Sequence, residues 1–297
     1  AKKWLITYKK PFVDANTYAL TYESLVNGHL IPYFGQARLT DIRPVDIQNF
    51  FATKTQCSES RLKKMKSILN ALFEAAIEND LCYKNPAKHS TFRSTAARHE
   101  KQVLTDEQIQ ITKDFARSRM PEVIVLLETG LRRGELLGLM WSDLDEQSGT
   151  IRVQRSMALK NKRVVANPPK WNSFRTLPLS DEALRVIRAQ PHDSLYIFPN
   201  EHGRPHSPYS WSQKLGRFMR DLHTAHPEVP TLTAHELRHT YGTYLRRHGV
   251  DIYTIQKLLG HKDIQITTEV YVHNEIDQLR SALRPVYAPE PAQESAE

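Results

Sequence analysis

A polar stretch at residues 87–103 interrupts the apolar pattern of this 297-residue chain. The stretch has no apolar period and is rich in small and polar residues, as is typical of a linker. The parts on either side are each long enough to bury a hydrophobic core. We therefore predict two domains, residues 1–88 and 104–288, joined by a linker at 89–103.

The first domain is predicted to be helical. Between Ser60 and Asn79, apolar residues recur at helical spacing while cations crowd the first turns. Charge runs of this kind are common on solvated helix faces, so the cations indicate DNA binding only together with the rest of the chain. The candidate DNA-binding residues are Lys54, Arg61, Lys63, Lys64 and Lys66.

The second domain has a mixed pattern. A capping-box sequence at Thr105 and Gln108 predicts the start of a helix. Three strand patterns predict one small antiparallel sheet, and the chain from residue 207 onward is predicted to be helical. The fold class is therefore α+β and mainly α. The strands are expected at 151–154, 163–166 and 175–179, and the helices at 210–224, 234–247, 252–259 and 268–283, before an acidic tail at 289–297 that we expect to be disordered.

Composition excludes several classes of protein. Hydrophobic residues make up 40% of the chain and charged residues 25%, which is typical of a globular protein. No apolar run approaches the roughly 20 residues of a membrane span, and residues 1–5 do not resemble a signal peptide. We expect a cytoplasmic protein whose two cysteines, Cys57 and Cys82, are reduced.

The charge of the chain favours a polyanionic partner. The formal net charge is +8, and residues 1–100 hold fifteen Lys and Arg against nine Asp and Glu. Such an excess would bind DNA phosphates without reading sequence. The affinity should then fall steeply with salt, because binding releases counterions.

Several groups suited to phosphate chemistry occur along the second domain. Arg132 follows a glycine-flanked turn, where the backbone can approach a ligand and a guanidinium fork can hold an oxyanion. Further on come the pair His235-x-x-Arg238, then His261, and then Tyr271. Together these side chains suit a phosphodiester better than a neutral substrate.

In order and spacing, these five residues resemble the catalytic residues of the tyrosine recombinases, the phage integrase family. That family carries a lysine on a β-hairpin between its two arginines, and Lys170 in segment 169–179 looks like this lysine, although Lys160 and Lys162 lie nearby. The resemblance also covers residues 17–51 and 71–86, which look like a helical core-DNA-binding domain. It implies that such a domain precedes a mixed catalytic domain.

The resemblance assigns a role to each residue. Tyr271 would attack the scissile phosphate and form a 3′-phosphotyrosine, while Arg132 and Arg238 bind the non-bridging oxygens. His261 would donate to the phosphate, and His235 would act as general base or acid. Lys170 would protonate the leaving 5′ oxygen.

Supporting roles complete this predicted site. Glu135 would orient the arginines. His239 and His273 are expected to pack or to face solvent, outside the site. No metal and no other cofactor is expected, because positive side chains supply the charge that a metal would bring.

The resemblance further implies a site-specific recombinase of a phage or mobile element that integrates or excises DNA in a bacterial cell. The expected partners are double-stranded DNA attachment sites, three further protomers in a tetramer on DNA, and accessory DNA-bending proteins. Residues beyond Tyr271 are candidates for contacts between protomers. Many members also carry an N-terminal arm-binding domain, and a chain that begins at Ala1 without Met is typical of a trimmed protein.

Three alternatives remain. His235, Glu236 and His239 satisfy the H-E-x-x-H pattern of zinc proteases, with Glu269 as an indifferent third ligand. A DNA-binding module without catalysis would not need Tyr271. A type IB topoisomerase shares the tyrosine and arginine chemistry but relaxes a single DNA.

Overall fold

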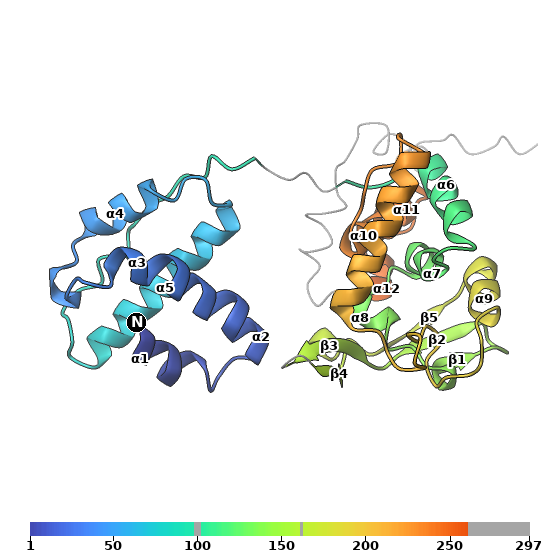
Figure 1. Cartoon of the computed structure of the whole chain (residues 1–297), viewed down its shortest axis with the longest axis horizontal. Coiled ribbons are helices and arrows are strands. Elements are labelled where there is room, and N and C mark those ends of the chain that lie inside the picture. Colours follow the sequence, from blue (N-terminus) through green and yellow to red (C-terminus); the bar gives the residue numbers. More distant parts are fainter. Residues whose placement is uncertain (98–101, 161–162, 261–297) are drawn as a thin grey trace, which may run out of the picture. The chain divides into compact units, whose positions relative to one another are not determined.

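The computed structural model describes residues 1–97, 102–160 and 163–260. The chain divides into two compact units, Ala1–Glu100 (unit 1) and Lys101–Glu297 (unit 2) (Figure 1). The helix predicted at 268–283 and the disordered tail predicted at 289–297 lie outside the described residues.

Unit 1 is a set of helices around one apolar core, as its pattern predicted. Phe50, Leu62 and Met65 are completely buried in this core, and Phe51 and Phe73 are 1% exposed. Consecutive α-helical and π-helical segments form one continuous helix from Ala15 to Phe34. The elements are α1 (Lys2–Trp4), η1 (Leu5–Lys9), α2 (Ala15–Thr17), η2 (Tyr18–Glu23), η3 (Val26–Leu30), α3 (Ile31–Phe34), η4 (Leu39–Asp41), α4 (Pro44–Ala52) and α5 (Glu59–Glu78).

Part of the predicted linker belongs to unit 1. The Phe92 ring lies 5.6 Å from that of Phe51, and Ser94 Oγ donates to the carbonyl of Cys57 at 2.8 Å. Thr95 N donates to the carbonyl of Thr55 at 2.7 Å. The first part of the predicted linker, from residue 89 to Thr95, therefore packs against the rest of unit 1. One aromatic ring and a few hydrogen bonds anchor this segment although its composition is polar.

Unit 2 is organised around α7 (Glu122–Thr129), whose residues Val123 to Leu126 are completely buried. It packs against α6 (Asp106–Ala116), α9 (Asp181–Arg188) and α11 (Ala234–Arg247). Lys113 on α6 contacts the carboxylates of Glu128 on α7 and Glu182 on α9 and so joins three helices. The other helical elements are α8 (Arg133–Leu136), η5 (Trp141–Asp143), η6 (Lys170–Asn172), α10 (Pro208–Ala225) and α12 (Ile252–Leu259).

Two small antiparallel sheets lie along one edge of unit 2, with α10, α11 and α12 on the other side (Figure 1). One sheet has the order β1 (Leu144–Asp145), β2 (Thr150–Val153), β5 (Arg175–Pro178), and the other pairs β3 (Ser156–Lys160) with β4 (Arg163–Asn167). The prediction of a single sheet is therefore wrong. Strand β3, with the sequence Ser-Met-Ala-Leu-Lys, has few of the residues that mark strands, and it takes β4 as its partner.

Local signals predicted several helix boundaries correctly. The capping box of α6 is present, since Thr105 N donates to Gln108 Oε1 at 3.0 Å and Gln108 N donates to Thr105 Oγ1 at 3.3 Å. The bounds of α11 and α12 are confirmed, and α12 stops at Gly260, which has a φ of +65°. No helix within the described residues is both long and apolar enough to cross a membrane.

Three helices of unit 2 meet at Gly130, the left-handed residue that ends α7. Its φ is +60°, and an added Cβ would lie 2.3 Å from Tyr241 Cδ1 on α11 and 2.7 Å from Leu259 Cδ2 on α12. Only glycine combines this backbone conformation with so close an approach. The contact fixes the C-terminal end of α7 beside α11 and α12.

We expect Gly130→Ala to lower the free energy of unfolding of unit 2 by about 2–5 kcal/mol, because it adds backbone strain to a steric clash. Gly149→Ala is the matched control, since Gly149 has a φ of +61° but no atom within 4 Å of an added Cβ. It should cost only about 1 kcal/mol. Urea unfolding of both variants measures the difference, and equal losses would contradict the role of the close contact.

Candidate active site

A buried carboxylate holds a cluster of arginines in unit 2. Glu135 on α8 has no exposed surface. Its Oε1 accepts a hydrogen bond from Arg132 Nη1 at 2.7 Å, and its Oε2 accepts one from Arg175 Nη2 at 2.8 Å. Arg238 Nη1 lies 4.0 Å from Oε2. The positive charges offset the cost of burying the carboxylate, and we call these four residues the Glu135 cluster.

The same arginines bind the end of α12. Arg175 Nε donates to the carbonyl of Leu258 at 2.8 Å, Arg238 Nη2 donates to that of Leu259, and Arg132 Nη2 donates to that of Gly260 at 2.8 Å. The last carbonyls of a helix lack intrahelical partners and form the negative end of its dipole. Three guanidinium groups thus converge on consecutive carbonyls, immediately before His261.

The two arginines predicted from the sequence are brought together from distant segments. Arg132 is the N-cap residue of α8, and its backbone N donates to Glu135 Oε2 at 2.9 Å. Arg238 projects from α11, and its Nη1 donates to the carbonyl of Gly130 at 2.8 Å. Arg132 is partly exposed, with 24% of its side chain accessible, whereas the Arg238 side chain is 2% exposed.

His235 lies on α11 one helical turn before Arg238 and is exposed. Its ring meets that of the buried His239 edge to face, with centroids 4.4 Å apart. An exposed imidazole on the helix that carries Arg238 is accessible for proton exchange with a substrate. His239 has the packing position that the sequence indicated.

Glu236 caps a helix, which accounts for the acidic residue of the zinc-protease pattern. Its Oε2 accepts hydrogen bonds from Thr233 N and Thr233 Oγ1, both at 2.8 Å, so the carboxylate is directed at the N-terminus of α11. Residues 1–97, 102–160 and 163–260 contain no group of three or more His, Cys, Asp or Glu side chains placed to hold a metal ion. Glu269, the suggested third ligand, lies outside these ranges.

Lys170 is exposed in η6, between β4 and β5. Its Nζ lies 5.5 Å from the centroid of the Trp171 ring. Within the described residues, the turn is linked to the Glu135 cluster by Ser173, whose Oγ accepts from Arg132 Nη1 at 3.4 Å, and by Arg175. Lys170 thus lies on a turn attached to the cluster, with its ammonium over an aromatic ring.

The remaining predicted catalytic residues, His261 and Tyr271, lie outside the described residues, as does the alternative lysine Lys162. The structure describes the chain up to Gly260, whose carbonyl accepts the hydrogen bond from Arg132.

The sequence pattern places Arg175 only in a strand and does not indicate its role in the cluster. Arg175 alternates along β5 with exposed residues and shares a face with the buried Leu177. A cation at a core-facing strand position requires a buried partner, and this was the available signal. The partner is Glu135, whose helical segment is distant in sequence.

The electrostatics of the cluster favour an ionised Glu135. Burial raises the pKa of Glu135, but the hydrogen bond and charge of Arg175 and the charge of Arg132 outweigh burial and hold the pKa below its ordinary value.

A tyrosine other than Tyr271, Tyr241 on α11, lies near this cluster. Burial and then the charge of Glu128 raise the pKa of Tyr241 to about 12, so it stays protonated at neutral pH.

The candidate DNA-binding cations of unit 1 have different surroundings. Arg61 and Lys64 are exposed near the start of α5. Lys63 Nζ pairs with Glu59 Oε1 at 2.7 Å, and Lys66 Nζ donates to the carbonyl of Ser90. Lys54 is half-buried, with its Nζ 5.8 Å from the centroid of the Phe50 ring. The predicted group is therefore not one uniform cationic face.

Arg61 and Lys54 nevertheless act on a common neighbour. Burial, followed by the positive charges of Arg61 and Lys54, lowers the pKa of His29.

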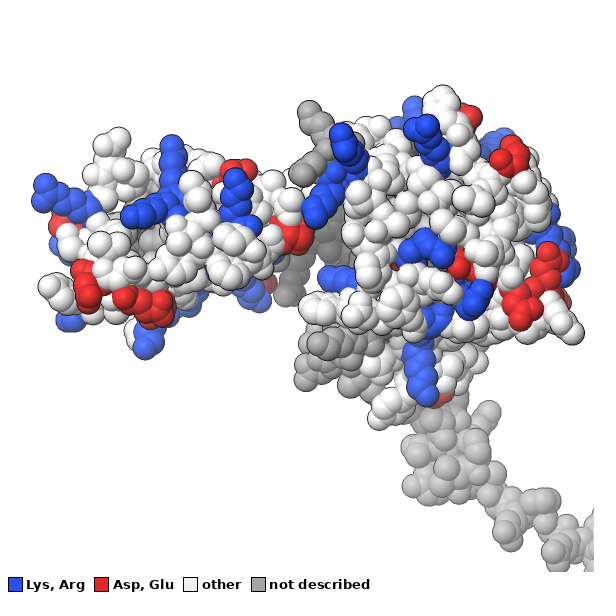
Figure 2. Space-filling model, turned by 90° about the horizontal axis from the view of Figure 1, so that it is seen from below, with Lys and Arg blue, Asp and Glu red and all other residues white. Residues whose placement is uncertain are grey.

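On the face of unit 2 visible in Figure 2, basic side chains are spread over the surface, and acidic ones gather mainly at the right-hand edge.

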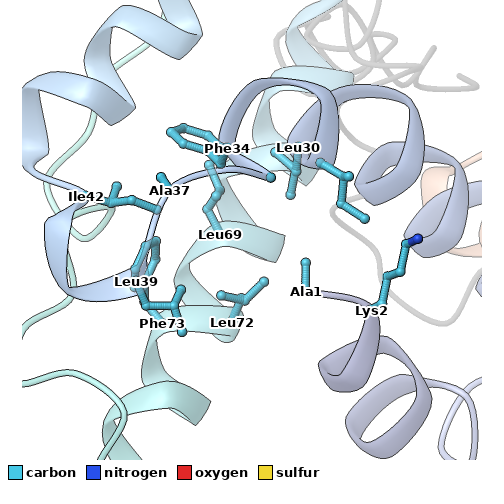
Figure 3. A pocket seen from close by; sticks show the side chains of 12 residues that line it. Ala1, Lys2, Leu30, Phe34, Ala37, Leu39, Ile42, Leu69, Leu72 and Phe73 are labelled. Atoms are coloured by element: carbon cyan, nitrogen blue, oxygen red, sulfur yellow. The ribbon is translucent and has the colours of Figure 1, made fainter.

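A pocket of about 350 Å³ in unit 1 has a different character (Figure 3). Apolar side chains such as Leu30, Phe34 and Phe73 line most of it, and Lys2 lies at its border. This lining offers no cluster of groups for phosphate chemistry. The Glu135 cluster is therefore the better candidate for an active site.

Comparison with known proteins identifies the family. Residues 98–277 match the phage integrase family, and residues 1–55 match the phage integrase N-terminal SAM-like domain. Because the first match covers more than half of the sequence, the chain belongs to the phage integrase family. It is an enzyme of the tyrosine recombinase class, which cleaves and rejoins DNA strands in the site-specific recombination of mobile elements. The predicted family, enzyme class and function are thereby confirmed, against the protease and non-catalytic alternatives.

Individual relatives span most of the chain. It is 28% identical over 272 residues to a XerC-like tyrosine recombinase of Caldanaerobacter subterraneus subsp. tengcongensis, which covers 80% of this chain and 68% of the relative. It is 25% identical over 271 residues to the ICEBs1 integrase of Bacillus subtilis, with coverages of 84% and 72%.

Solved structures share the fold. The Tn1549 transposon integrase in complex with transposon right end DNA has a TM-score of 0.80 at 24% identity and covers 97% of this chain and 98% of that one. A lambda integrase tetramer bound to a Holliday junction has a TM-score of 0.71 at 18% identity, with coverages of 92% and 77%. The predicted fold class, α+β and mainly α, is confirmed.

Glu135→Gln should reduce the free energy of unfolding of unit 2 by about 3–5 kcal/mol at neutral pH, because it leaves buried guanidinium groups without their counter-ion. The pKa of Glu135 is lowered in the folded state, so its contribution is present above the ordinary pKa of about 4.3 and is lost as the pH falls through the lower folded pKa. The difference between wild type and variant should therefore shrink below about pH 4.

Urea unfolding at several pH values measures this dependence. Glu201→Gln is a suitable control, because the Glu201 side chain is 86% exposed, and it should change the stability by less than about 0.5 kcal/mol. A constant difference between wild type and Glu135→Gln down to pH 3 would contradict an ionised Glu135 with a lowered pKa.

Proposed function

We propose that this recombinase cleaves DNA through Tyr271, with Arg132 and Arg238 holding the scissile phosphate. One observation carries the proposal: both guanidinium groups converge on Glu135 and on the last carbonyls of α12, directly before His261. Guanidinium groups match the geometry of phosphate oxygens and keep their charge throughout the reaction. The partial exposure of Arg132 is consistent with access of a phosphate to this cluster.

In the first step, Tyr271 Oη forms a bond to phosphorus and the bond to the 5′ oxygen breaks. His235, exposed on α11, takes the tyrosine proton, and Lys170 donates a proton to the departing 5′ oxygen. His261 donates a hydrogen bond to the phosphate. The product is a 3′-phosphotyrosine and a free 5′ hydroxyl.

The covalent intermediate retains the energy of the phosphodiester bond. A 5′ hydroxyl of a second strand can therefore reverse the chemistry and rejoin DNA without ATP. The arginines, lysine and histidines supply the positive charge and the protons, so the mechanism requires no metal ion and no organic cofactor.

The proposed substrates are double-stranded attachment sites of a phage or other mobile element, in the cytoplasm of a bacterial host. We propose that four protomers assemble on two such sites and that residues beyond Tyr271 form the contacts between protomers. Accessory DNA-bending proteins are further proposed partners of this assembly. The DNA complex of the Tn1549 integrase and the lambda integrase tetramer on a Holliday junction support this assembly through their shared fold.

A nicked suicide substrate tests the nucleophile. After cleavage, the short fragment that carries the free 5′ hydroxyl dissociates, so the reaction cannot reverse and the covalent complex is trapped. Wild type should give a DNA-linked band on a denaturing gel in EDTA, and Tyr271→Phe should give none. Tyr241→Phe is the matched control and should retain the band, because the Tyr241 ring packs against Gly130 and burial raises its pKa, which makes it a poor nucleophile. Arg238→Lys should slow cleavage by about 10²–10³-fold.

The suicide-substrate assay has clear adverse outcomes. A covalent band with Tyr271→Phe, or its loss with Tyr241→Phe, would contradict the assignment of the nucleophile. Relaxation of supercoiled DNA by a protein that never joins two sites would favour the topoisomerase alternative.

Arg61 and Lys64 should contribute to DNA affinity as phosphate contacts. Replacing both by Ala should weaken binding to different DNA sequences alike, and should reduce the slope of log affinity against log salt by about 2. Lys84→Ala is the control, because Lys84 is exposed beyond the opposite end of α5. Filter binding at several salt concentrations measures the slopes, and an unchanged slope for the double variant would exclude these contacts.

A further inference from the structure

Arg175 makes more contacts within the cluster than a strand residue requires. Its Nη2 and Nη1 donate to the two carboxylate oxygens of Glu135, at 2.8 and 3.3 Å, in a bidentate pair. Its Nε donates to the carbonyl of Leu258 at 2.8 Å, and Nη1 also donates to that of Ser173 at 3.3 Å. The side chain is 8% exposed. All three nitrogens of this guanidinium thus donate to acceptors of the protein.

The end of α12 is fitted against this guanidinium. Gly260 has a φ of +65°, and an added Cβ would lie 3.0 Å from Arg175 Nη1 and 3.2 Å from Cζ. The planar guanidinium therefore lies against the last turn of α12 and holds one of its terminal carbonyls. This contact therefore fixes the end of α12, at the residue that precedes His261 in the sequence.

The other side of Arg175 acts on Arg132. Glu135 Oε1 accepts from both Arg132 Nη1 and Arg175 Nη1, and Glu135 Oε2 accepts from both Arg132 N and Arg175 Nη2. Each carboxylate oxygen is thus shared between the two arginines. Moving Arg175 would move the carboxylate that orients Arg132.

We propose that Arg175 is a positioning residue of the recombination reaction: its guanidinium fixes both the Glu135 carboxylate that orients Arg132 and the last turn of α12 that leads into His261. The inference rests on the proposed function of Arg132 and His261 and adds a residue that touches neither DNA nor the reacting atoms. Arg175 acts through the two elements that it joins.

The charges around Glu135 give this role a signature in pH. Arg132 at the N-cap of α8, Arg175 on β5 and Arg238 on α11 face the carboxylate. Burial raises the pKa of Glu135, and Arg175 is the strongest of the groups that lower it. Without Arg175 the pKa of Glu135 rises, and a protonated Glu135 no longer holds Arg132 as a charged acceptor.

Single-turnover cleavage of the nicked suicide substrate, at saturating enzyme and across pH, tests the proposal. Arg175→Met should slow cleavage by about 10²-fold, as expected for misplaced catalytic groups, with DNA affinity within about threefold of wild type. The cleavage rate of Arg175→Met should rise with pH as Glu135 becomes ionised. In wild type Glu135 is already ionised over this range, so the pH dependence of cleavage follows Tyr271 and its proton acceptor alone. Arg175→Lys should recover part of the rate and a profile close to wild type, because it keeps the charge but not the planar fork.

Arg155→Met is the control for a merely structural role. Arg155 pairs with the buried Asp143 and donates to the carbonyl of Gly138 at 3.0 Å, so it is also a largely buried guanidinium that joins a carboxylate to a carbonyl. Its removal should lower the thermal midpoint as Arg175→Met does, yet leave the pH profile of cleavage unchanged. Arg175→Met should also cost less in a Glu135→Gln background than in wild type, because the two residues act as one unit.

Cleavage by Arg175→Met or Arg175→Lys at the wild-type rate would overturn the proposal, as would fully additive losses with Glu135→Gln. A pH profile shifted equally by Arg155→Met would reduce Arg175 to a structural residue. If Arg175→Met does not fold, the rate and DNA affinity of Arg175→Lys decide. Failure of wild type to form a covalent complex on DNA that it binds would instead refute the proposed function.

Discussion

The ion cluster around Glu135 is the interaction on which the rest of unit 2 depends. A carboxylate without exposed surface is costly unless charged donors surround it, and Arg132, Arg175 and Arg238 do so. The same guanidinium groups satisfy the last carbonyls of α12, which would otherwise lack partners. One buried charge thus holds α8, β5, α11 and the end of α12 at a single point, and it does so with residues suited to bind a phosphate.

Glycines permit this convergence. Gly130 ends α7 and Gly260 ends α12, both in the left-handed conformation, and both lie where a Cβ would meet another element. Because the helices end there, their terminal carbonyls become acceptors for Arg238 and Arg132. The two glycines that allow the helices to pack closely therefore also set the orientation of Arg238 and Arg132, because the carbonyls at these helix ends hold the guanidinium groups.

The elements that the sequence predicted well are those defined by local signals. The capping box at Thr105 and the stop at Gly260 each depend on residues within one helical turn, so the bounds of α12 and the start of α6 followed directly. Strand pairing depends on distant residues. The sequence predicts β4 in one sheet with β2 and β5, but β4 pairs with β3, whose strand pattern is weak. The polar composition around Phe92 predicts a linker, whereas the segment packs against unit 1, since a single anchoring ring leaves no period in a sequence.

The sequence by itself determined the chemistry: which residues carry cations and imidazoles, in an order and spacing similar to those of the tyrosine recombinases. It also determined α5, α10, α11, α12 and the start of α6, because periodicity and caps are local properties. Only the tertiary structure decided which charges belong together. It joined Arg175 to Glu135 and directed Lys63 and Lys66 to partners within unit 1. The physical reason is that an ion pair depends on distance in space, which the packing of distant segments sets and sequence spacing does not reveal.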